Sequence, residues 1–338
     1  MLMVIFGAGA SYDSWPSFPP DRMPREHEVF RPPLAKELFL HFDPFRQASQ
    51  KYDRCQPLIP YLERQDNVEE ILEQFRVEAE GNKERRRQLL ALQFYIREVI
   101  RTCQNVWLTK TFGVTNFRTL VDQVHPCSEI CFVTFNYDTL LEGALIKVDV
   151  DFPDIHSYVS KTTYKVFKLH GSIDWWSWRS AQNTNVRSSD QPSEADLIRA
   201  APELEGEEVI AKEGARPPEI PREYLYHYYP ALAIPTLSKS KFVCPPDHIE
   251  ALEKCIKTVD KIVIVGWRAG ERNFLEMLAS GLPQGVDVIA ACGNEQAARE
   301  TLRNLTDAGT RPERSIVAPG GFTEFVLNRR IEPFLASQ

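Results

Sequence analysis

Short apolar runs that end in glycine or in a polar residue constrain the fold of this chain more than any other feature. In the last third of the sequence, such runs alternate with segments of helical periodicity. The runs are residues 2–6, 130–135, 166–169, 261–265, 286–291 and 315–317. Apolar strands that alternate with helices are typical of a parallel sheet with both faces covered. We therefore predict an α/β fold with a doubly wound, mostly parallel sheet.

A helical block separates the first of these runs from the second. Apolar residues recur at helical spacing, with Val68, Ile71, Leu72 and Phe75 at positions i, i+3, i+4 and i+7. A second, strongly apolar helix is expected over residues 89–100. The block therefore looks like a helical insertion into the sheet-bearing core.

These patterns predict a division of the chain into three parts. The helical insertion would span residues 60–125, and the polar, acidic and proline-bearing residues 179–223 would form a loop or lid with partial disorder. The core would comprise residues 1–50, 126–178 and 224–338.

Local signals add further expectations. The proline-rich residues 16–33 predict a long loop rather than a helix, and residues 34–42 predict a short helix. Residues 139–142 have the spacing of a capping box that begins a helix. Further helices are expected at residues 247–258, 273–278 and 295–305 and from about residue 323.

Composition excludes several classes of function. The chain has 338 residues, of which 43% are hydrophobic and 26% are charged, as in ordinary globular proteins. Its net charge of −7 disfavours direct binding to nucleic acid or to anionic lipid. The apolar run at residues 2–6 is too short for a signal peptide or a membrane span. We therefore expect a cytoplasmic protein without a nucleic-acid or membrane partner.

The cysteines do not form a metal-binding pattern. The sequence has seven cysteines, and no two of them have CxxC spacing. Cys127 and Cys131 are separated by three residues, with no matching second pair or histidine cluster. We interpret the cysteines as reduced side chains and predict no metal site.

The first candidate motif follows the first apolar run directly and consists of Gly7, Ala8, Gly9, Ala10 and Ser11. Glycine permits a tight turn after a strand and a close approach of pyrophosphate to the main chain. The third glycine of the dehydrogenase fingerprint is missing, because its place is taken by a tyrosine. The motif therefore predicts a phosphate-binding glycine turn outside the dehydrogenase class, and a purely structural turn is the alternative.

The second and third motifs follow the next two apolar runs. Asn136 and Asp138 stand two positions apart, so both side chains can face one crevice if the chain stays extended. The alternative is that Asp138 caps the next helix and Asn136 satisfies a turn. His170 is followed by Gly171, and an imidazole at a strand end can act as a general base at neutral pH. A structural histidine is the alternative.

Taken in this order, the three motifs resemble the sirtuin superfamily, and more closely its bacterial branch of sirtuin-like NAD hydrolases used in antiphage defence. Residues 67–72 look like the start of that branch's helical insertion, and residues 169–175 (LHGSIDW) look like its histidine motif. The resemblance spans about residues 2–326, leaves 179–230 unmatched, and departs from the family pattern at residues 267–272.

The resemblance implies a Rossmann-like core and a role for each motif. Asn136 would hold the nicotinamide ribose and the attacking water, Asp138 would lie near that ribose or the carboxamide, and His170 would contact the ribose hydroxyls as base or orienter. The implied NAD-binding residues are Gly7, Ala8, Gly9, Ala10, Ser11 and Gly171, with Gly266 and Asn294 near the adenosine half.

The resemblance also implies NAD as a substrate rather than a resident cofactor. The four-cysteine zinc ribbon of deacetylating sirtuins is missing from the sequence, so water is the expected acceptor. The products would be nicotinamide and ADP-ribose, or a cyclised ADP-ribose. The alternatives are an NAD or ADP-ribose sensor without turnover, a zinc-free deacylase or ADP-ribosyl transferase, and a scaffold subunit that docks a partner through residues 67–107.

Family behaviour further implies regulation, since a constitutive NAD hydrolase would harm its own cell. Control would come from self-assembly into a homo-oligomer, from a partner defence protein such as an ATPase or an Argonaute-type protein, or from residues 179–223 acting as a lid.

Overall fold

A parallel six-stranded sheet forms the centre of the computed structural model, which describes residues 1–125, 127, 129–180, 193–201, 208–214, 226–236 and 242–337. The strand order is β3-β2-β1-β7-β8-β9, and every neighbouring pair is parallel. The strands are β1 (Leu2–Phe6), β2 (Ile130–Thr134), β3 (Tyr164–Lys168), β7 (Lys261–Val265), β8 (Asp287–Ala291) and β9 (Arg314–Ala318).

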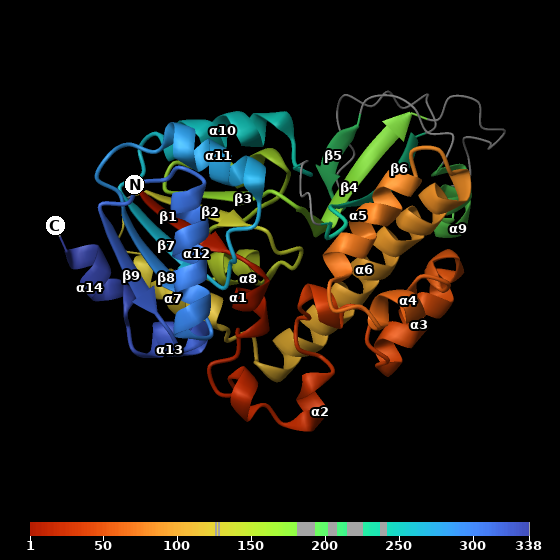
Figure 1. Ribbon diagram of the computed structural model, residues 1–338, viewed down its shortest axis with the longest axis horizontal. Helices are drawn as coiled ribbons and strands as arrows, with labels where there is room; N and C mark the ends of the chain where they lie inside the picture. The colour runs from red at the N-terminus through yellow and green to blue at the C-terminus, as the bar shows by residue number, and fades with distance from the viewer. Residues whose placement is uncertain are drawn as a thin grey trace.

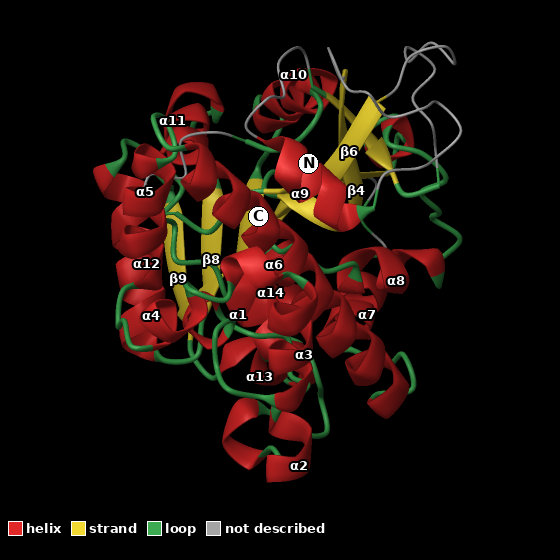
Figure 2. Ribbon diagram, turned by 90° about the vertical axis from the view of Figure 1, so that its right-hand side faces the viewer, coloured by secondary structure: helices red, strands yellow, loops and turns green. Residues whose placement is uncertain are grey.

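Helices cover both faces of this sheet (Figures 1 and 2). Successive residues of β1 alternate between two apolar clusters: Val4 and Phe6 face one cluster, and Met3 and Ile5 face the other. A strand with both faces buried explains why the sequence shows uninterrupted apolar runs. The predicted fold class, a doubly wound and mostly parallel sheet, is confirmed.

The other elements complete the chain. The helices are α1 (Ala8–Tyr12), η1 (Pro20–Arg22), α2 (Arg25–Glu28), η2 (Ala35–Glu37), α3 (Asp43–Lys51), η3 (Asp53–Cys55), α4 (Ile59–Glu63), α5 (Val68–Glu78), α6 (Lys83–Lys110), α7 (Asn116–Val124), α8 (Leu140–Ile146), η4 (His156–Tyr158), α9 (Glu194–Ala200), α10 (Pro246–Ile256), α11 (Arg272–Gly281), α12 (Glu295–Asp307), α13 (Gly321–Leu327) and α14 (Ile331–Ala336). The remaining strands are β4 (Gly171–Ser180), β5 (Val209–Lys212) and β6 (Tyr226–Leu232).

A second lobe lies beside the parallel sheet (Figure 1) and combines helices with a small antiparallel sheet in the order β5-β4-β6. Its apolar cluster joins α3, α5 and α6 to inward side chains of β4 and β6, among them Ile173, Trp176 and Leu232. By contrast, α7 packs with α8, α13 and α14 against the parallel sheet. The second lobe thus includes helices that lie before residue 60, and α7 packs with the core. The bounds of the insertion, residues 60–125, stay a prediction.

Several local expectations are wrong. Residues 7–11 were predicted as a tight glycine turn, but residues 8–12 form the single helical turn α1, in which the Gly7 carbonyl accepts a hydrogen bond from the Ala10 amide. The proline-rich residues 16–33 contain η1 and α2, and prolines occupy the N-terminal positions where a missing amide proton is tolerated. Residues 34–42 contain only the short turn η2.

Two further expectations need correction. The helix α8 begins at Leu140, but the predicted capping box is missing, since the Thr139 side chain makes no cap hydrogen bond. Asp138 Oδ1 instead accepts a hydrogen bond from the Leu140 amide at 3.1 Å. Within the predicted loop at residues 179–223, the structure describes the helix α9 and the strand β5, which pairs with β4. The remainder of that loop, residues 181–192, 202–207 and 215–223, lies outside the described residues.

Candidate active site at the strand ends

The three sequence motifs follow three neighbouring strands of the parallel sheet. Phe6 at the end of β1 pairs in register with Thr134 at the end of β2, and Thr134 pairs with Lys168 at the end of β3. Because these strands are parallel and in register, the residues that follow them emerge at the same edge of the sheet. In an open α/β sheet this is the edge where ligands bind.

Direct hydrogen bonds connect the first motif to the second. The Ser11 hydroxyl donates to Asp138 Oδ2 at 2.6 Å, and Asn136 Nδ2 donates to Ser11 Oγ at 2.8 Å. All three side chains are at most 7% exposed. We name Ser11, Asn136 and Asp138 the strand-end triad.

The triad leaves one buried oxygen without a partner. Asn136 Oδ1 has no hydrogen-bond partner among the described residues, although almost no surface of that atom is accessible. Buried polar atoms are normally satisfied, and an exception calls for a functional explanation. Because Nδ2 is committed to Ser11, the side-chain carbonyl of Asn136 is held as an acceptor for a group that enters the site.

His170 lies near the triad, next to the aromatic rings of the residues that flank Asn136 in the sequence. Its imidazole lies 5.0 Å from the ring of Phe135 and 6.4 Å from the ring of Tyr137, measured between ring centroids. Its carbonyl accepts a hydrogen bond from the Ala233 amide at 2.9 Å. The structure therefore brings the third motif to the same edge as the first two.

Gly171 enables the turn that follows His170. It has a φ of +80°, and a Cβ built there would lie 1.8 Å from the carbonyl oxygen of Ala231. A side chain at this position would collide with the backbone of β6. Gly171 therefore serves the close crossing of two chain segments behind the imidazole.

The glycines of the first motif pack against the end of β7. The Gly9 amide donates to the Gly266 carbonyl at 3.1 Å, and a Cβ on Gly7 would lie 2.6 Å from that carbonyl oxygen. Gly266 has a φ of +60°, and a Cβ there would lie 2.3 Å from the Ala10 amide nitrogen. The predicted nucleotide-binding residues Gly7, Gly9, Ala10 and Gly266 thus form one backbone contact between β1 and β7, while Ala8 is exposed.

Asn294 lies farther from the triad than the other predicted residues. It follows β8, which is separated from β1 by β7 in the sheet order. Its side chain caps α12 by accepting a hydrogen bond from the Ala297 amide at 2.8 Å. The structure places Asn294 at the same edge of the sheet, and its observed contact is that of a helix cap.

Asp13, which no sequence motif included, connects the residues after β1 to α13 near the C-terminus. Asp13 Oδ2 accepts a hydrogen bond from the Thr323 amide at 3.0 Å, at the beginning of α13. Burial raises the pKa of Asp13, while the hydrogen bonds from Thr323 oppose that rise. An acidic residue two positions after the glycine motif was the only signal in the sequence.

Lys168 and Glu142 form a buried ion pair behind the triad, with 2.9 Å between Lys168 Nζ and Glu142 Oε1. The sequence carried a signal for this pair that was not used: a lysine inside an apolar strand run needs a buried partner. Glu142 was instead assigned to a capping box.

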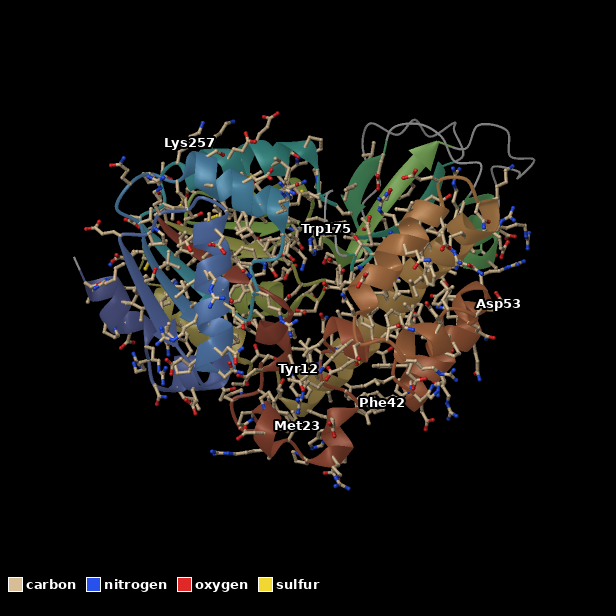
Figure 3. The ribbon with its side chains drawn as sticks, viewed as in Figure 1. Tyr12, Met23, Phe42, Asp53, Trp175 and Lys257 are labelled. Atoms are coloured by element: carbon tan, nitrogen blue, oxygen red, sulfur yellow. The ribbon has the colours of Figure 1, made fainter. Side chains whose placement is uncertain are left out.

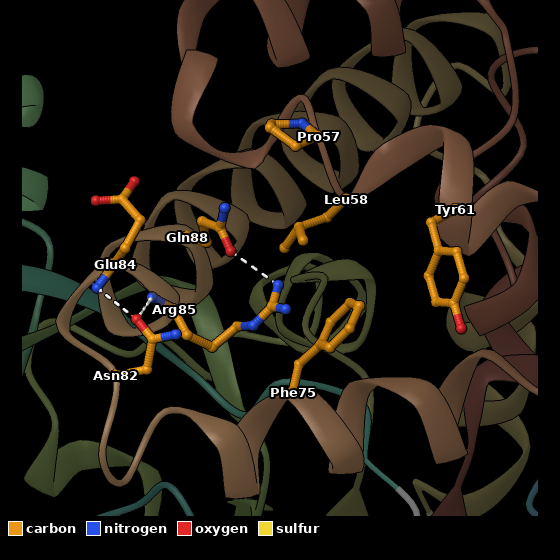
Figure 4. Close-up of a pocket in the computed structure, with 8 residues that line it drawn as sticks. All are labelled: Pro57, Leu58, Tyr61, Phe75, Asn82, Glu84, Arg85 and Gln88. Carbon is orange, nitrogen blue, oxygen red and sulfur yellow. Dashed lines mark hydrogen bonds between the residues drawn. The ribbon is translucent and has the colours of Figure 1, made fainter.

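The chain has another hollow away from the triad, shown in Figure 4. It has a volume of about 500 Å³ and lies between α4, α5 and the beginning of α6. Its lining includes Tyr61, Phe75 and Arg85. A smaller hollow next to α1 is lined by Tyr12, which Figure 3 labels, and by Arg31, whose guanidinium carbon lies 4.4 Å from the Tyr12 ring centroid.

Two features are absent from the described residues. These residues contain no group of three or more histidine, cysteine, aspartate or glutamate side chains placed to hold a metal ion. No helix in the described part of the chain is long and apolar enough to cross a membrane.

Part of the chain is similar to a known family. Residues 130–285 match the family model described as a SIR2-like domain. One solved structure, a mutant Sir2 homologue in complex with 2′-O-acetyl ADP ribose, is 14% identical with a TM-score of 0.41, over 100% of this chain and 94% of that chain. Another, a Sir2 homologue–NAD complex, is 14% identical with a TM-score of 0.39, over 98% of this chain and 89% of that chain. No curated protein matches the sequence.

Proposed function

We propose that this chain, whose residues 130–285 match a SIR2-like domain, is an NAD glycohydrolase that cleaves the bond between nicotinamide and ribose. The observation that carries the proposal is the strand-end triad, in which the buried carbonyl oxygen of Asn136 has no partner in the described part of the chain and lies beside Asp138. The family match supports the use of NAD, and the triad supports the chemistry.

The charges of the triad suit the cleavage of NAD. Nicotinamide in NAD is a cationic leaving group, so its departure requires no proton donor. The ribose left behind develops positive charge, as in other glycosyl transfers. Asp138 supplies a carboxylate whose orientation is fixed by the Ser11 hydroxyl. A preorganised negative group near the developing cation favours the transition state.

Asn136 and His170 have complementary roles in this proposal. The free Oδ1 of Asn136 can accept a hydrogen bond from the attacking water or from a ribose hydroxyl. His170 can take a proton from that water or hydroxyl near neutral pH. Both side chains are almost fully buried, so the water that reacts is a positioned one.

The nucleotide half of NAD would lie over the contact between β1 and β7. In this proposal Ala8 to Ser11 line the pyrophosphate and the adjacent ribose, and Gly266 and Asn294 lie near the adenosine. Glycine at positions 9 and 266 allows the two strand ends to touch, because a Cβ at either position would lie less than 3 Å from the backbone of the other segment. The departure of residues 267–272 from the family pattern affects this half.

The resemblance of residues 67–72 and 169–175 to the antiphage branch supports a biological role. We infer that the protein is a cytoplasmic effector that depletes NAD during phage infection, controlled by homo-oligomer formation or by a partner defence protein. Cells that express the protein should lose NAD only when infected, and cells with Asn136→Ala should retain it. Unchanged NAD in infected wild-type cells would contradict this role.

The reaction is tested by incubating the purified full chain with NAD and quantifying nicotinamide, ADP-ribose and cyclic ADP-ribose. The expected result is stoichiometric nicotinamide and ADP-ribose, or its cyclic form, without any other substrate. Tight NAD binding without products in every oligomeric state and with every candidate partner would indicate a sensor. NAD consumption that depends on an acylated peptide would indicate a deacylase. Either outcome would overturn the hydrolase proposal.

A further inference from the structure

The buried ion pair between Lys168 and Glu142 lies directly behind the strand-end triad. Lys168 is the last residue of β3, and Glu142 lies in the first turn of α8. The lysine side chain is 0% exposed and that of the glutamate 6%, with 2.9 Å between the charged atoms. The pair thus connects the strand that leads to His170 with the helix that follows Asp138.

The lysine also holds the backbone of Asp138. Lys168 Nζ donates a hydrogen bond to the Asp138 carbonyl oxygen. The carboxylate of Asp138 is held from its other side, since Oδ2 accepts from Ser11 at 2.6 Å and Oδ1 accepts from the Leu140 amide at 3.1 Å. Asp138 is therefore fixed at three atoms, and Lys168 supplies the only one of these contacts that comes from β3.

Burial of the two charges carries a desolvation cost in the folded protein. Burial raises the pKa of Glu142, and the charge of Lys168 only partly opposes that rise. The neighbours of Glu142 in α8, Leu140, Leu141 and Leu145, belong to the apolar cluster on one face of the sheet. Apolar residues of similar volume often replace a buried ion pair without loss of stability. Stability alone therefore does not explain two opposite charges at this place.

We propose that Lys168 and Glu142 are positioning residues for the proposed cleavage of NAD. Glu142 holds the ammonium group of Lys168 in place, and Lys168 fixes the Asp138 carbonyl, which orients the Asp138 carboxylate toward Ser11. Neither residue needs to touch NAD. A displacement of about 1 Å at a reacting group lowers the rate about 100-fold, so the pair acts on kcat rather than on KM. This inference rests on the proposed function.

The experiment compares four variants of the full chain: Lys168→Met, Glu142→Met, the double variant with both changes, and Tyr158→Phe. Each single methionine leaves one buried charge without its partner and should lower the melting temperature. The double variant removes both charges and should melt close to the wild type. The Tyr158 hydroxyl donates to Glu142 Oε1 at 3.2 Å without contacting Asp138, so Tyr158→Phe controls for a general disturbance of the buried network.

Two measurements separate positioning from a purely structural role. The double variant should release nicotinamide with a kcat about 100-fold below wild type and an unchanged KM, although its melting temperature is restored. The Leu140 amide, which reports the position of Asp138 Oδ1, should exchange with deuterium faster than in wild type. Tyr158→Phe should leave both quantities near the wild-type values.

The outcomes decide the inference in either direction. A double variant with wild-type kcat, with unchanged exchange at Leu140, or with a melting temperature no higher than the single variants would overturn it, because the pair would then serve only the fold. If the wild type releases no nicotinamide under any condition, the proposed function fails separately. The exchange at Leu140 in the double variant then still decides whether the pair positions Asp138.

Discussion

The strand-end triad and the hollow between α4, α5 and α6 differ in how their polar groups are satisfied. The triad is buried, its members bind one another, and Asn136 Oδ1 remains without a partner among the described residues. The hollow has a volume of about 500 Å³, yet Arg85 in its lining is already paired with Glu78 at 2.8 Å and lies 4.2 Å from the Phe75 ring centroid.

The hollow between α4, α5 and α6 is therefore a poorer candidate for a catalytic site than the strand-end triad. Catalysis depends on preorganised polar groups that are shielded from water, because such groups act on developing charge without reorganising. The triad has this property, whereas Glu84 and Arg85 in the lining of the hollow already form ion pairs with neighbouring side chains. Function is therefore expected where the sequence motifs converge.

Removal of the Asn136 amide should have the largest effect. Asn136→Ala deletes the buried acceptor and should lower kcat for nicotinamide release about 100- to 1000-fold, the range found when a transition-state hydrogen-bonding group is lost. Arg85→Ala, in the lining of the hollow, should leave kcat unchanged. Initial rates at saturating NAD measure both variants. Equal loss of activity in the two variants would erase the contrast between the sites.

A methyl group at Gly266 should have the next largest effect, on stability. Gly266→Ala places a Cβ 2.3 Å from the Ala10 nitrogen at a φ of +60°, and we expect a loss of roughly 2–4 kcal/mol in the free energy of unfolding. Gly81→Ala in the helical lobe is the matched control, because a Cβ there meets no atom within 4 Å. Urea denaturation measures both, and a stable Gly266→Ala variant would disprove the close contact between β1 and β7.

Acid should destabilise the core through His248. Burial lowers the pKa of His248 below its usual value of 6.5, so the unfolded chain binds a proton at a higher pH than the folded chain does. The contribution of His248 to stability is therefore present above about pH 6.5 and is lost as the pH falls below it. His248→Gln should reduce the loss of stability as the pH falls from about 7 to about 5.5. Melting curves across this range measure the effect, and an unchanged pH dependence in His248→Gln would contradict it.

Loss of a charge in the hollow should have the smallest effect. Arg85→Ala removes the partly exposed ion pair with Glu78, and such pairs contribute about 0–1 kcal/mol. The same variant should therefore unfold at nearly the wild-type urea concentration. A loss larger than that of Gly266→Ala would show that the hollow, and not the strand ends, carries the more constrained packing.

The sequence predicts the parallel sheet well because most of its strands are buried on both faces, whereas the edge strand β9 is more exposed. β1 and β7 have the bounds expected from their apolar runs, and the three motifs were expected to meet for the same reason. The small sheet β5-β4-β6 was missed, since the short strand β5 gives little periodicity and lies in a polar, acidic stretch. Pairing between segments distant in sequence leaves no local signal.

The roles of single residues were harder to predict where a side chain could bind either a local backbone group or a residue distant in the sequence. The spacing of Thr139 and Glu142 suits a capping box, but Glu142 pairs with Lys168 from another strand, and Asp138 caps the helix instead. A capping box depends on local geometry, whereas a buried lysine demands a counter-charge from anywhere in the fold. The functional assignments of Asn136, Asp138 and His170 remain predictions, supported by their proximity.

The central claim is that three neighbouring strand ends form one NAD-cleaving site, and a crystal structure of the wild-type protein with ADP-ribose tests it most directly. The account predicts that the terminal ribose lies within hydrogen-bonding distance of Asn136 Oδ1, with the pyrophosphate along residues 8–11. ADP-ribose bound elsewhere, for example in the hollow lined by Tyr61 and Arg85, with the strand-end triad unchanged and unliganded, would contradict the account.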